Sequence, residues 1–204
     1  MYARTEKKER SLGIKLFIKA HRCNSPKCAM MRHPNKPGQH GGARRRALSE
    51  FGQQLQEKQK FKFAYGLREA QMRRVVEKAI KTPSNTGPLI VSLLERRLDN
   101  VVYRLGFAPS RSMARQAVSH GHIMVNDRKV TVPSLQVKVG DTITIRPQSK
   151  DYNLYKNLAA DLAKYETPIW LALDKDKMIG KVASLPKDFE IPFDVNMVID
   201  YYSK

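Results

Sequence analysis

Residues 94–107 read LERRLDNVVYRLGF and contain the clearest helical pattern in the chain. Their large apolar side chains recur at the spacing that places them on one face of an α-helix. These side chains are Leu94, Leu98, Val101, Val102 and Leu105. Gly106 follows them, and glycine is a common residue at the end of a helix. We therefore predict a single helix over residues 89–105.

A second helix and a change of period follow. Ser110 is a residue type that caps helices and Gly121 is one that ends them, so we predict a short helix over residues 111–120. The apolar period then becomes the period of two that is typical of strands. Two hairpins are expected, with strands at residues 122–126, 130–132, 136–139 and 142–146. The segment is thus predicted to form two helices followed by a small antiparallel sheet.

Two further helices are predicted before this segment. Ser49 suits the N-cap of a helix over residues 50–64, and a second helix spans residues 69–81. The proline, glycine and small polar side chains of residues 82–88 predict a linker and a domain boundary. Beyond the sheet, residues 153–165 have a helical pattern, and the remainder of the chain is expected to alternate short loops and strands.

The first 47 residues have few large apolar side chains. Prolines precede the run GQHGG at residues 38–42, so irregular backbone is expected here. A segment of this composition buries too little surface to fold by itself. It is predicted to be a basic extended arm, which is either a flexible tail or becomes ordered against RNA. The second alternative is favoured by three consecutive arginines, Arg44, Arg45 and Arg46.

The chain carries 38 Lys and Arg against 19 Asp and Glu, a formal net charge of +19. Residues 1–88 hold 21 basic and 6 acidic side chains, residues 89–150 hold 10 and 4, and residues 151–204 hold 7 and 9. A polyanionic partner relieves this self-repulsion, so nucleic acid is the expected partner of the first three quarters of the chain. A membrane-surface protein is the other basic class, but we find neither an apolar run of about 18 residues nor a strongly apolar helix face beside a basic one.

The cysteine content and the N-terminus suggest the compartment. Cys23 and Cys28 are too few for a disulfide framework, and no apolar run long enough for a signal peptide follows the N-terminus. We therefore expect a cytoplasmic protein, or one in an organelle that has its own translation.

Several motifs resemble a known family when they are taken in order. The sequence has PGQHG at residues 37–41, LQEKQK at 55–60, LERRLDNVVYRLGF at 94–107, ARQ at 114–116, SHGHIMVN at 119–126 and a terminal YSK. Together they resemble the family of the fourth protein of the bacterial-type small ribosomal subunit, whose RNA-binding module is the alpha-L domain. The resemblance covers essentially the whole chain.

The resemblance implies an α+β fold, with a mostly helical rRNA-binding domain and an inserted alpha-L domain. The expected division is an arm at residues 1–47, a helical domain from residues 48–88 plus 166–204, and an alpha-L domain at residues 89–165. It further implies a structural constituent of the small ribosomal subunit that binds small-subunit rRNA, nucleates assembly and influences translational accuracy near the mRNA entry site. Its expected partners are that rRNA, mRNA near the entry channel and the neighbouring small-subunit ribosomal protein five.

The predicted RNA-binding surface is centred on Arg111 and Arg115. They lie four residues apart, so one helix face presents both guanidinium groups, which bind phosphate in a bidentate way. Neither lies on the apolar stripe, so we expect the fold not to depend on them; the alternative is a face that is merely solvated. Further donors where the chain turns into the first hairpin are His120, His122, Asn126 and Lys129. The other basic residues assigned to RNA are Arg44, Arg45, Arg46, Lys58, Lys60, Arg73 and Arg74.

The aromatic stretch FKFAY at residues 61–65 allows two interpretations. It could stack nucleobases. Aromatic side chains at a helix end are more often core anchors, and we favour that interpretation here.

Cys23 and Cys28 raise the question of zinc. Some members of the family carry a Cys-x-x-Cys that completes a four-cysteine site with the equivalent pair, and here those two positions are Glu6 and Glu9. Two thiols are half of a structural zinc site. Further ligands could come from His21, His33 or His40. We expect no cofactor, with zinc at the two cysteines as the alternative.

The rival functional class is an RNA-modifying enzyme or a synthetase, since alpha-L domains are appended to pseudouridine synthases and tyrosyl-tRNA synthetases. Such enzymes need a separate catalytic domain, whereas an arm, two helices and a short tail remain here. We find no P-loop, no nucleophile with a partner histidine and no convincing carboxylate pair. An isolated alpha-L module is another rival, but the match outside that domain argues against it. We therefore predict that the protein is not an enzyme.

Overall fold

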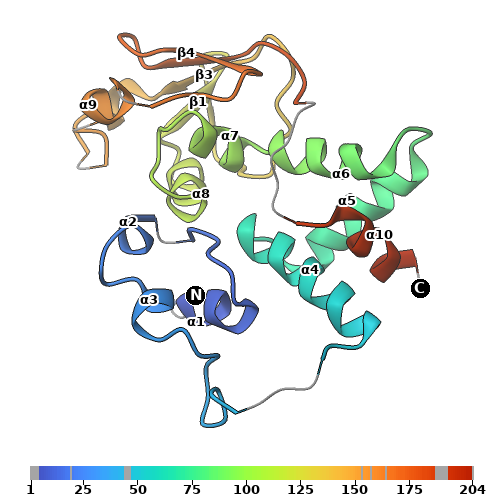
Figure 1. Ribbon diagram of the computed structural model, residues 1–204. Helices are drawn as coiled ribbons and strands as arrows, with labels where there is room; N and C mark the ends of the chain where they lie inside the picture. Colours follow the sequence, from blue (N-terminus) through green and yellow to red (C-terminus); the bar gives the residue numbers. More distant parts are fainter. Residues whose placement is uncertain are drawn as a thin grey trace. The chain divides into compact units, whose positions relative to one another are not determined.

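The structure is a computed structural model that describes residues 5–18, 20–43, 47–152, 154–156, 158–163, 165–186 and 193–203. The chain divides into two compact units, Met1–Ile90 with Glu190–Lys204, and Val91–Phe189. Helices and one small antiparallel sheet make up the regular structure of the described residues, so the fold class is α+β, as predicted (Figure 1).

The body of the first unit is built from α4 (Glu50–Ala64), α5 (Glu69–Lys81) and α10 (Val195–Ser203). The bounds of α4 and α5 confirm the prediction, and the Ser49 hydroxyl accepts a hydrogen bond from the Gly52 N–H. α10 packs against both of these helices and corrects the prediction of loops and strands at the chain end. Asp194 begins it, because its carboxylate accepts the N–H groups of the next turn.

Aromatic side chains anchor this unit. Phe61 and Tyr65 are buried, and the ring of Phe61 meets that of Phe193 edge-on, with centroids 5.2 Å apart. The interpretation of residues 61–65 as core anchors is therefore confirmed for these two side chains.

The prediction of an irregular arm is wrong for much of the N-terminal segment, which contains α1 (Thr5–Leu12), α2 (Ala20–Cys23) and α3 (Ala29–Arg32). α1 contacts α3 and α4, and Gln56 Nε2 donates to the Leu12 carbonyl at 3.1 Å. A buried carboxylate with its hydrogen bonds organises this segment, which has few large apolar side chains for a core. The Glu9 side chain is almost completely buried, and its carboxylate accepts the N–H groups of Leu16 and Ile18.

The predicted helix over residues 89–105 is in fact two helices, α6 (Thr86–Glu95) and α7 (Leu98–Arg104). Arg97 is extended and forms a bridge with Gln136, while the N–H of Leu98 donates to the Leu135 carbonyl at 2.8 Å. Tertiary hydrogen bonds thus replace the helical ones at this point. Asn100 Nδ2 donates to the Glu95 carbonyl, which satisfies the end of α6.

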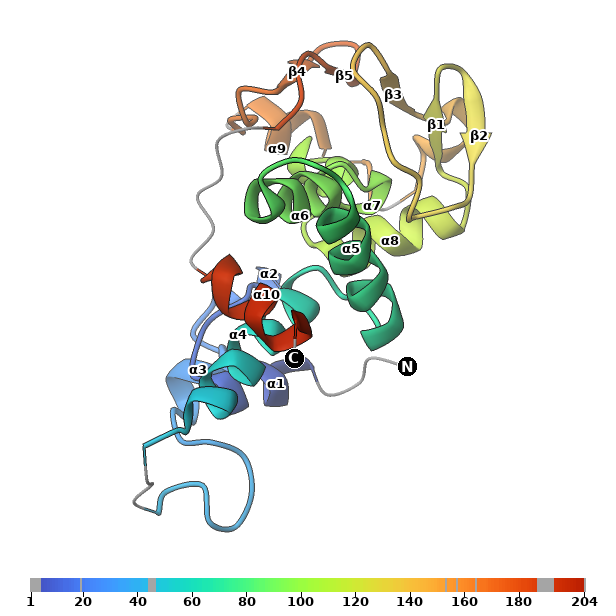
Figure 2. The ribbon, with the colours of Figure 1, turned by 90° about the vertical axis from the view of Figure 1, so that its right-hand side faces the viewer.

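The second unit contains a sheet of β1 (Ile123–Val125), β2 (Arg128–Val130), β3 (Thr142–Ile145), β4 (Leu171–Asp174) and β5 (Ile179–Val182). The order is β2-β1-β3-β5-β4, and every pair is antiparallel (Figure 2). The first hairpin exists as predicted, but its returning strand is Arg128–Val130 instead of residues 130–132. Asn126 and Asp127 both have positive φ, so the turn has two residues and the strand begins directly after it.

The second predicted hairpin is wrong. Residues 136–139 form no strand; Gln136 bridges to Arg97 instead, and β3 pairs with β1 and β5. Because β4 and β5 extend the same sheet, the boundary predicted at residue 165 is also corrected: the second unit continues to Phe189. The helix predicted over residues 153–165 is the shorter α9 (Leu158–Ala163), which follows a 3-10 turn, η1 (Pro147–Ser149).

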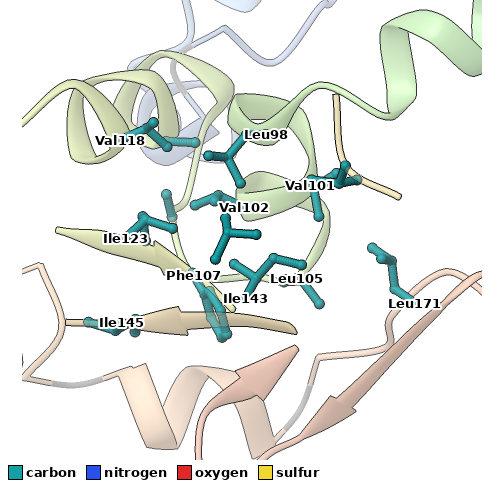
Figure 3. Packing of buried hydrophobic residues seen from close by; sticks show 14 of the residues in the cluster. Leu98, Val101, Val102, Leu105, Phe107, Val118, Ile123, Ile143, Ile145 and Leu171 are labelled. Atoms are coloured by element: carbon teal, nitrogen blue, oxygen red, sulfur yellow. The ribbon is translucent and has the colours of Figure 1, made fainter. Parts of the chain in front are cut away.

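The core of the second unit lies between the sheet and α7 with α8 (Arg111–Ser119). Figure 3 shows the apolar face of α7 opposite the strands. The side chains that meet there include Leu98, Val102, Leu105, Val118, Ile123 and Ile143, all of them fully buried. This packing fixes the end of α8 and the first hairpin, on which the candidate site is built.

Candidate nucleic-acid interface

The junction between α8 and β1 brings two histidines beside a lysine. Ser110 begins α8 by accepting the Met113 N–H, as predicted, and Gly121 follows it with φ of +76°. A side chain at Gly121 would overlap the Lys129 side chain, which lies across this glycine. The positive φ of the turn favours glycine here, and the end of the flexible Lys129 side chain lies against it.

His122 is the centre of this arrangement. Its Nδ1 lies 3.0 Å from the buried Ser149 hydroxyl, and its ring centroid is 5.9 Å from that of His120. Partial burial lowers the pKa of His122 below its usual 6.5, and the positive charges of His120, Arg146 and Lys129 lower that pKa further. We call His120, His122, Lys129 and Arg146 the histidine patch. It offers N–H donors in a positive field, which suits a phosphate.

Arg146 was not predicted as a site residue. It joins the patch because its N–H donates to the His122 carbonyl at 2.8 Å, where β3 ends beside β1. The position follows from the register that pairs Ile123 with Ile145. Only that register, and no local pattern, could have revealed it.

Asn126 has a mainly architectural role in the structure. Its Nδ2 donates to Asp141 at 2.8 Å, and its Oδ1 accepts the Thr142 N–H at 2.9 Å. These bonds tie the first hairpin to the start of β3. Its amide is thus engaged within the unit, although the residue is exposed.

Arg111 and Arg115 lie on one face of α8, as predicted, but each is paired inside the second unit. Arg115 Nε donates to Asp99 at 2.9 Å. Arg111 Nε donates to Asn100 Oδ1 at 2.7 Å, and its guanidinium lies 4.7 Å from the centroid of the Tyr103 ring. The side chain of Arg111 is 21% exposed and that of Arg115 is 25% exposed.

Two buried carboxylates of the fold lie beside these arginines: Arg115 bonds to Asp99, and Arg111 lies 4.0 Å from Glu95. Asp99 is 3% exposed and also accepts two hydrogen bonds from Arg97. Glu95 is 1% exposed and accepts two from Arg104. A buried charge is tolerated only when it is paired in this way. This pairing argues against the expectation that the fold does not depend on Arg111 and Arg115, and a measurement of stability tests it.

In the first unit, two of the lysines predicted to bind RNA form ion pairs with carboxylates of the same unit. Lys58 is buried, with Nζ 3.0 Å from Glu69 and 4.2 Å from the centroid of the Tyr201 ring. Lys60 is paired with Glu57. By contrast Arg73, whose Nε lies 3.8 Å from Glu77, is well exposed, and Arg74 is exposed beside it on α5. Three more predicted site residues lie outside the described residues, namely Arg44, Arg45 and Arg46.

Cys23 and Cys28 are buried thiols. The Cys23 Sγ lies 3.9 Å from both carboxylate oxygens of Glu9. Within the described residues, no cluster of three or more His, Cys, Asp or Glu side chains is arranged to hold a metal ion. The same part of the chain contains no helix whose length and apolar character would suit a membrane span.

Comparison with known proteins gives a consistent result along the chain. Residues 2–95 match the family model described as the ribosomal protein S4/S9 N-terminal domain, and residues 96–143 match the S4 domain. A protein of Caldicellulosiruptor bescii is 48% identical over 194 residues, which cover 94% of this chain and 93% of that protein. One from Thermus thermophilus is 48% identical over 195 residues (94% and 93%), and one from Chloroflexus aurantiacus is 46% identical over 203 residues (97% and 96%). All three bear the name small ribosomal subunit protein uS4.

Proposed function

The chain belongs to the uS4 family of ribosomal proteins, and we propose that it binds small-subunit rRNA directly as a structural component of that subunit. The family is structural and non-enzymatic. The histidine patch is the observation that carries the proposal. It lies in the unit that contains the S4 domain and combines cationic side chains with ring N–H groups where α8 meets the first hairpin.

Charge and geometry together favour RNA as the ligand. The net charge of +19 attracts a phosphate backbone and repels a cationic partner. The residues of the patch belong to a helix end and to neighbouring strands, so their backbones are held at fixed spacing. A fixed array of donors recognises the shape of a folded RNA more readily than its sequence. The exposed Arg73 and Arg74 on α5 supply a second group of cations in the first unit.

We extend the proposal to the finer roles that the family resemblance implies. The protein would bind rRNA early and nucleate assembly of the small subunit. It would lie near the mRNA entry channel beside ribosomal protein five, and with that protein it would influence translational accuracy. Its place of action would be the ribosome of the cytoplasm. Zinc is not part of the proposal.

A filter-binding titration with small-subunit rRNA tests the proposed surface. The double variant Lys129→Ala/Arg146→Ala removes two cations from the patch, whereas Lys177→Ala/Lys181→Ala removes two from β5 and the turn before it, towards the other edge of the sheet. We expect the patch variant to bind at least about tenfold more weakly, because charge-assisted bonds to phosphate are lost. The control should stay close to the wild type. Equal affinities of the two variants would refute the assignment.

A further inference from the structure

An exposed tyrosine stands next to the histidine patch. Tyr152 is 56% exposed, and its ring centroid lies 4.8 Å from that of His122 with the two planes tilted by 53°. What distinguishes Tyr152 is its neighbour, because the exposed ring lies against a histidine that cationic side chains surround. Neither the apolar pattern nor the charge of the sequence singles it out.

The backbone holds Tyr152 in place although its ring is open. The N–H of Tyr152 donates to the Ser149 carbonyl at 3.2 Å, and the Tyr152 carbonyl accepts the Tyr155 N–H at 2.8 Å. Ser149 is buried and also contacts the His122 ring. The tyrosine and the histidine are therefore fixed to one structural support, and little conformational entropy is lost when a ligand contacts both.

Tyr155 closes the inner side of this arrangement. It is 4% exposed, and its ring meets that of His122 at 73° with centroids 6.4 Å apart. Burial raises the pKa of Tyr155 to about 12, so its phenol remains neutral at physiological pH. The exposed ring of Tyr152 thus packs on His122, which has the neutral Tyr155 on its inner side and the cations Lys129 and Arg146 near it.

We propose that Tyr152 and His122 form a stacking site for an unpaired nucleobase of single-stranded RNA, whose phosphate lies on the histidine patch. This inference rests on the proposed RNA-binding function and adds a contact with a base to the contacts with phosphate. An apolar protein surface would gain from the tyrosine ring but would meet uncompensated positive charge around it. A nucleotide has both a flat aromatic face and an anionic group, so it matches both halves of the site.

Stacking does not require a particular base, because every base has a π-face. The site would therefore hold a nucleotide that the folded RNA leaves out of its helices. A planar ring at position 152 is the essential feature, and the tyrosine hydroxyl is not. A variant that keeps the ring and loses the hydroxyl therefore tells stacking apart from hydrogen bonding by Tyr152.

The test compares two short RNA strands of about ten nucleotides, one of uridines and one of abasic residues with the same backbone. Their affinities for the full chain are measured by fluorescence anisotropy. The phosphate contribution is common to both, so the ratio of the two affinities reports contacts with bases. The variants are Tyr152→Ala and Tyr152→Phe, with Tyr201→Ala as an aromatic control from α10. Melting curves establish that each variant is folded.

We expect Tyr152→Ala to bind the uridine strand about 5- to 100-fold more weakly than the wild type and the abasic strand about equally. Tyr152→Phe and Tyr201→Ala should keep the preference for the uridine strand. The inference is overturned if the wild type shows no such preference, or if Tyr152→Ala retains it. A parallel titration of the wild type with small-subunit rRNA separates the two proposals: failure to bind that RNA would refute the proposed function itself.

Discussion

Arg115 shows how one side chain serves the fold on the face where RNA was expected. Its guanidinium is a quarter exposed, yet it shares the buried carboxylate of Asp99 with Arg97. Without Arg115, Asp99 would keep only part of its hydrogen bonding in a site that is closed to water. The residue therefore stabilises the junction between α7 and α8, whatever it contributes to binding.

We predict that Arg115→Ala lowers the free energy of unfolding by about 1.5–3 kcal/mol, because a hydrogen-bonded ion pair to a buried charge is lost. Arg115→Lys should recover only part of this, since an ammonium cannot form the same fork. Urea unfolding followed by circular dichroism measures both. The exposed neighbour Gln116→Ala is the matched control, with an expected change within about 0.5 kcal/mol. An unchanged urea midpoint for Arg115→Ala would show that Asp99 does not need this partner.

At the scale of elements, α10 is attached to the first unit by a polar cluster around Glu69. Tyr202 on α10 donates to this carboxylate at 2.7 Å, and Lys58 and Lys62 of α4 lie 3.0 and 2.7 Å from it. Partial burial alone would raise the pKa of Glu69, but the hydrogen bonds from Lys62, Tyr202 and Lys58 outweigh it and lower the pKa to about 2.

This cluster predicts a pH dependence with a definite sign. The pKa of Glu69 falls from 4.5 in the unfolded chain to about 2 in the fold, so its contribution to stability is complete above pH 4.5 and is lost as the pH falls towards 2. The melting temperatures of the wild type and Glu69→Gln should therefore differ most near pH 6 and converge near pH 2. The half-exposed carboxylate makes the effect modest. A constant difference over this range would contradict the assignment.

The N-terminal helices carry the second prediction at this scale. The Glu9 carboxylate accepts the N–H groups of Leu16 and Ile18 beside Cys23, so a hydrogen-bonded hub organises the segment. We propose that it needs no zinc, because two thiols and one carboxylate that is already hydrogen-bonded make a poor tetrahedral site. Elemental analysis of the purified protein should find far less than one zinc per chain. Stoichiometric zinc that is lost in Cys23→Ser would overturn this proposal.

The elements that could be predicted from sequence are those with local signals. Caps and periodicity located α4, α5 and α8, and the turn residues from Asn126 located the first hairpin, although its second strand begins two residues earlier than predicted. The break between α6 and α7 has no such signal, because the apolar spacing continues across Arg97 and tertiary hydrogen bonds interrupt the helix. The same holds for β4 and β5, whose place in the sheet depends on pairing with distant β3.

The candidate site divides in the same way. His120, His122 and Lys129 follow from the turn after α8, which the sequence locates. The internal partners of Lys58 and Arg115 could not be predicted, because Glu69 and Asp99 reach them from other helices. Basic side chains are recognised from sequence, but whether they face solvent or a carboxylate depends on tertiary packing.

At the scale of the whole molecule, charge is the dominant property. Residues 1–150 carry a net charge of +21 and residues 151–204 one of −2. Several of the cations pair with carboxylates inside the fold, as Lys58 does with Glu69 and Arg104 with Glu95. The cations that remain exposed, among them Lys129 and Arg74, are available for phosphate.

This excess charge predicts a steep dependence of rRNA binding on salt. If about eight phosphates are neutralised, log K should fall against log salt concentration with a slope of about −6 to −7. Lys129→Ala/Arg146→Ala should make the slope shallower by about 1.5, since two contacts are removed. Filter binding over a range of salt concentrations measures both slopes. A slope near zero would mean that phosphate contacts do not dominate.

The central claim is that this protein is a component of the small ribosomal subunit held there by rRNA. Sedimentation of the tagged chain through a sucrose gradient tests it most directly. After a moderate-salt wash of a cell extract that contains the protein, we expect it to migrate with the small subunits and with intact ribosomes. Recovery at the top of the gradient as free protein, or with isolated large subunits, would contradict the account.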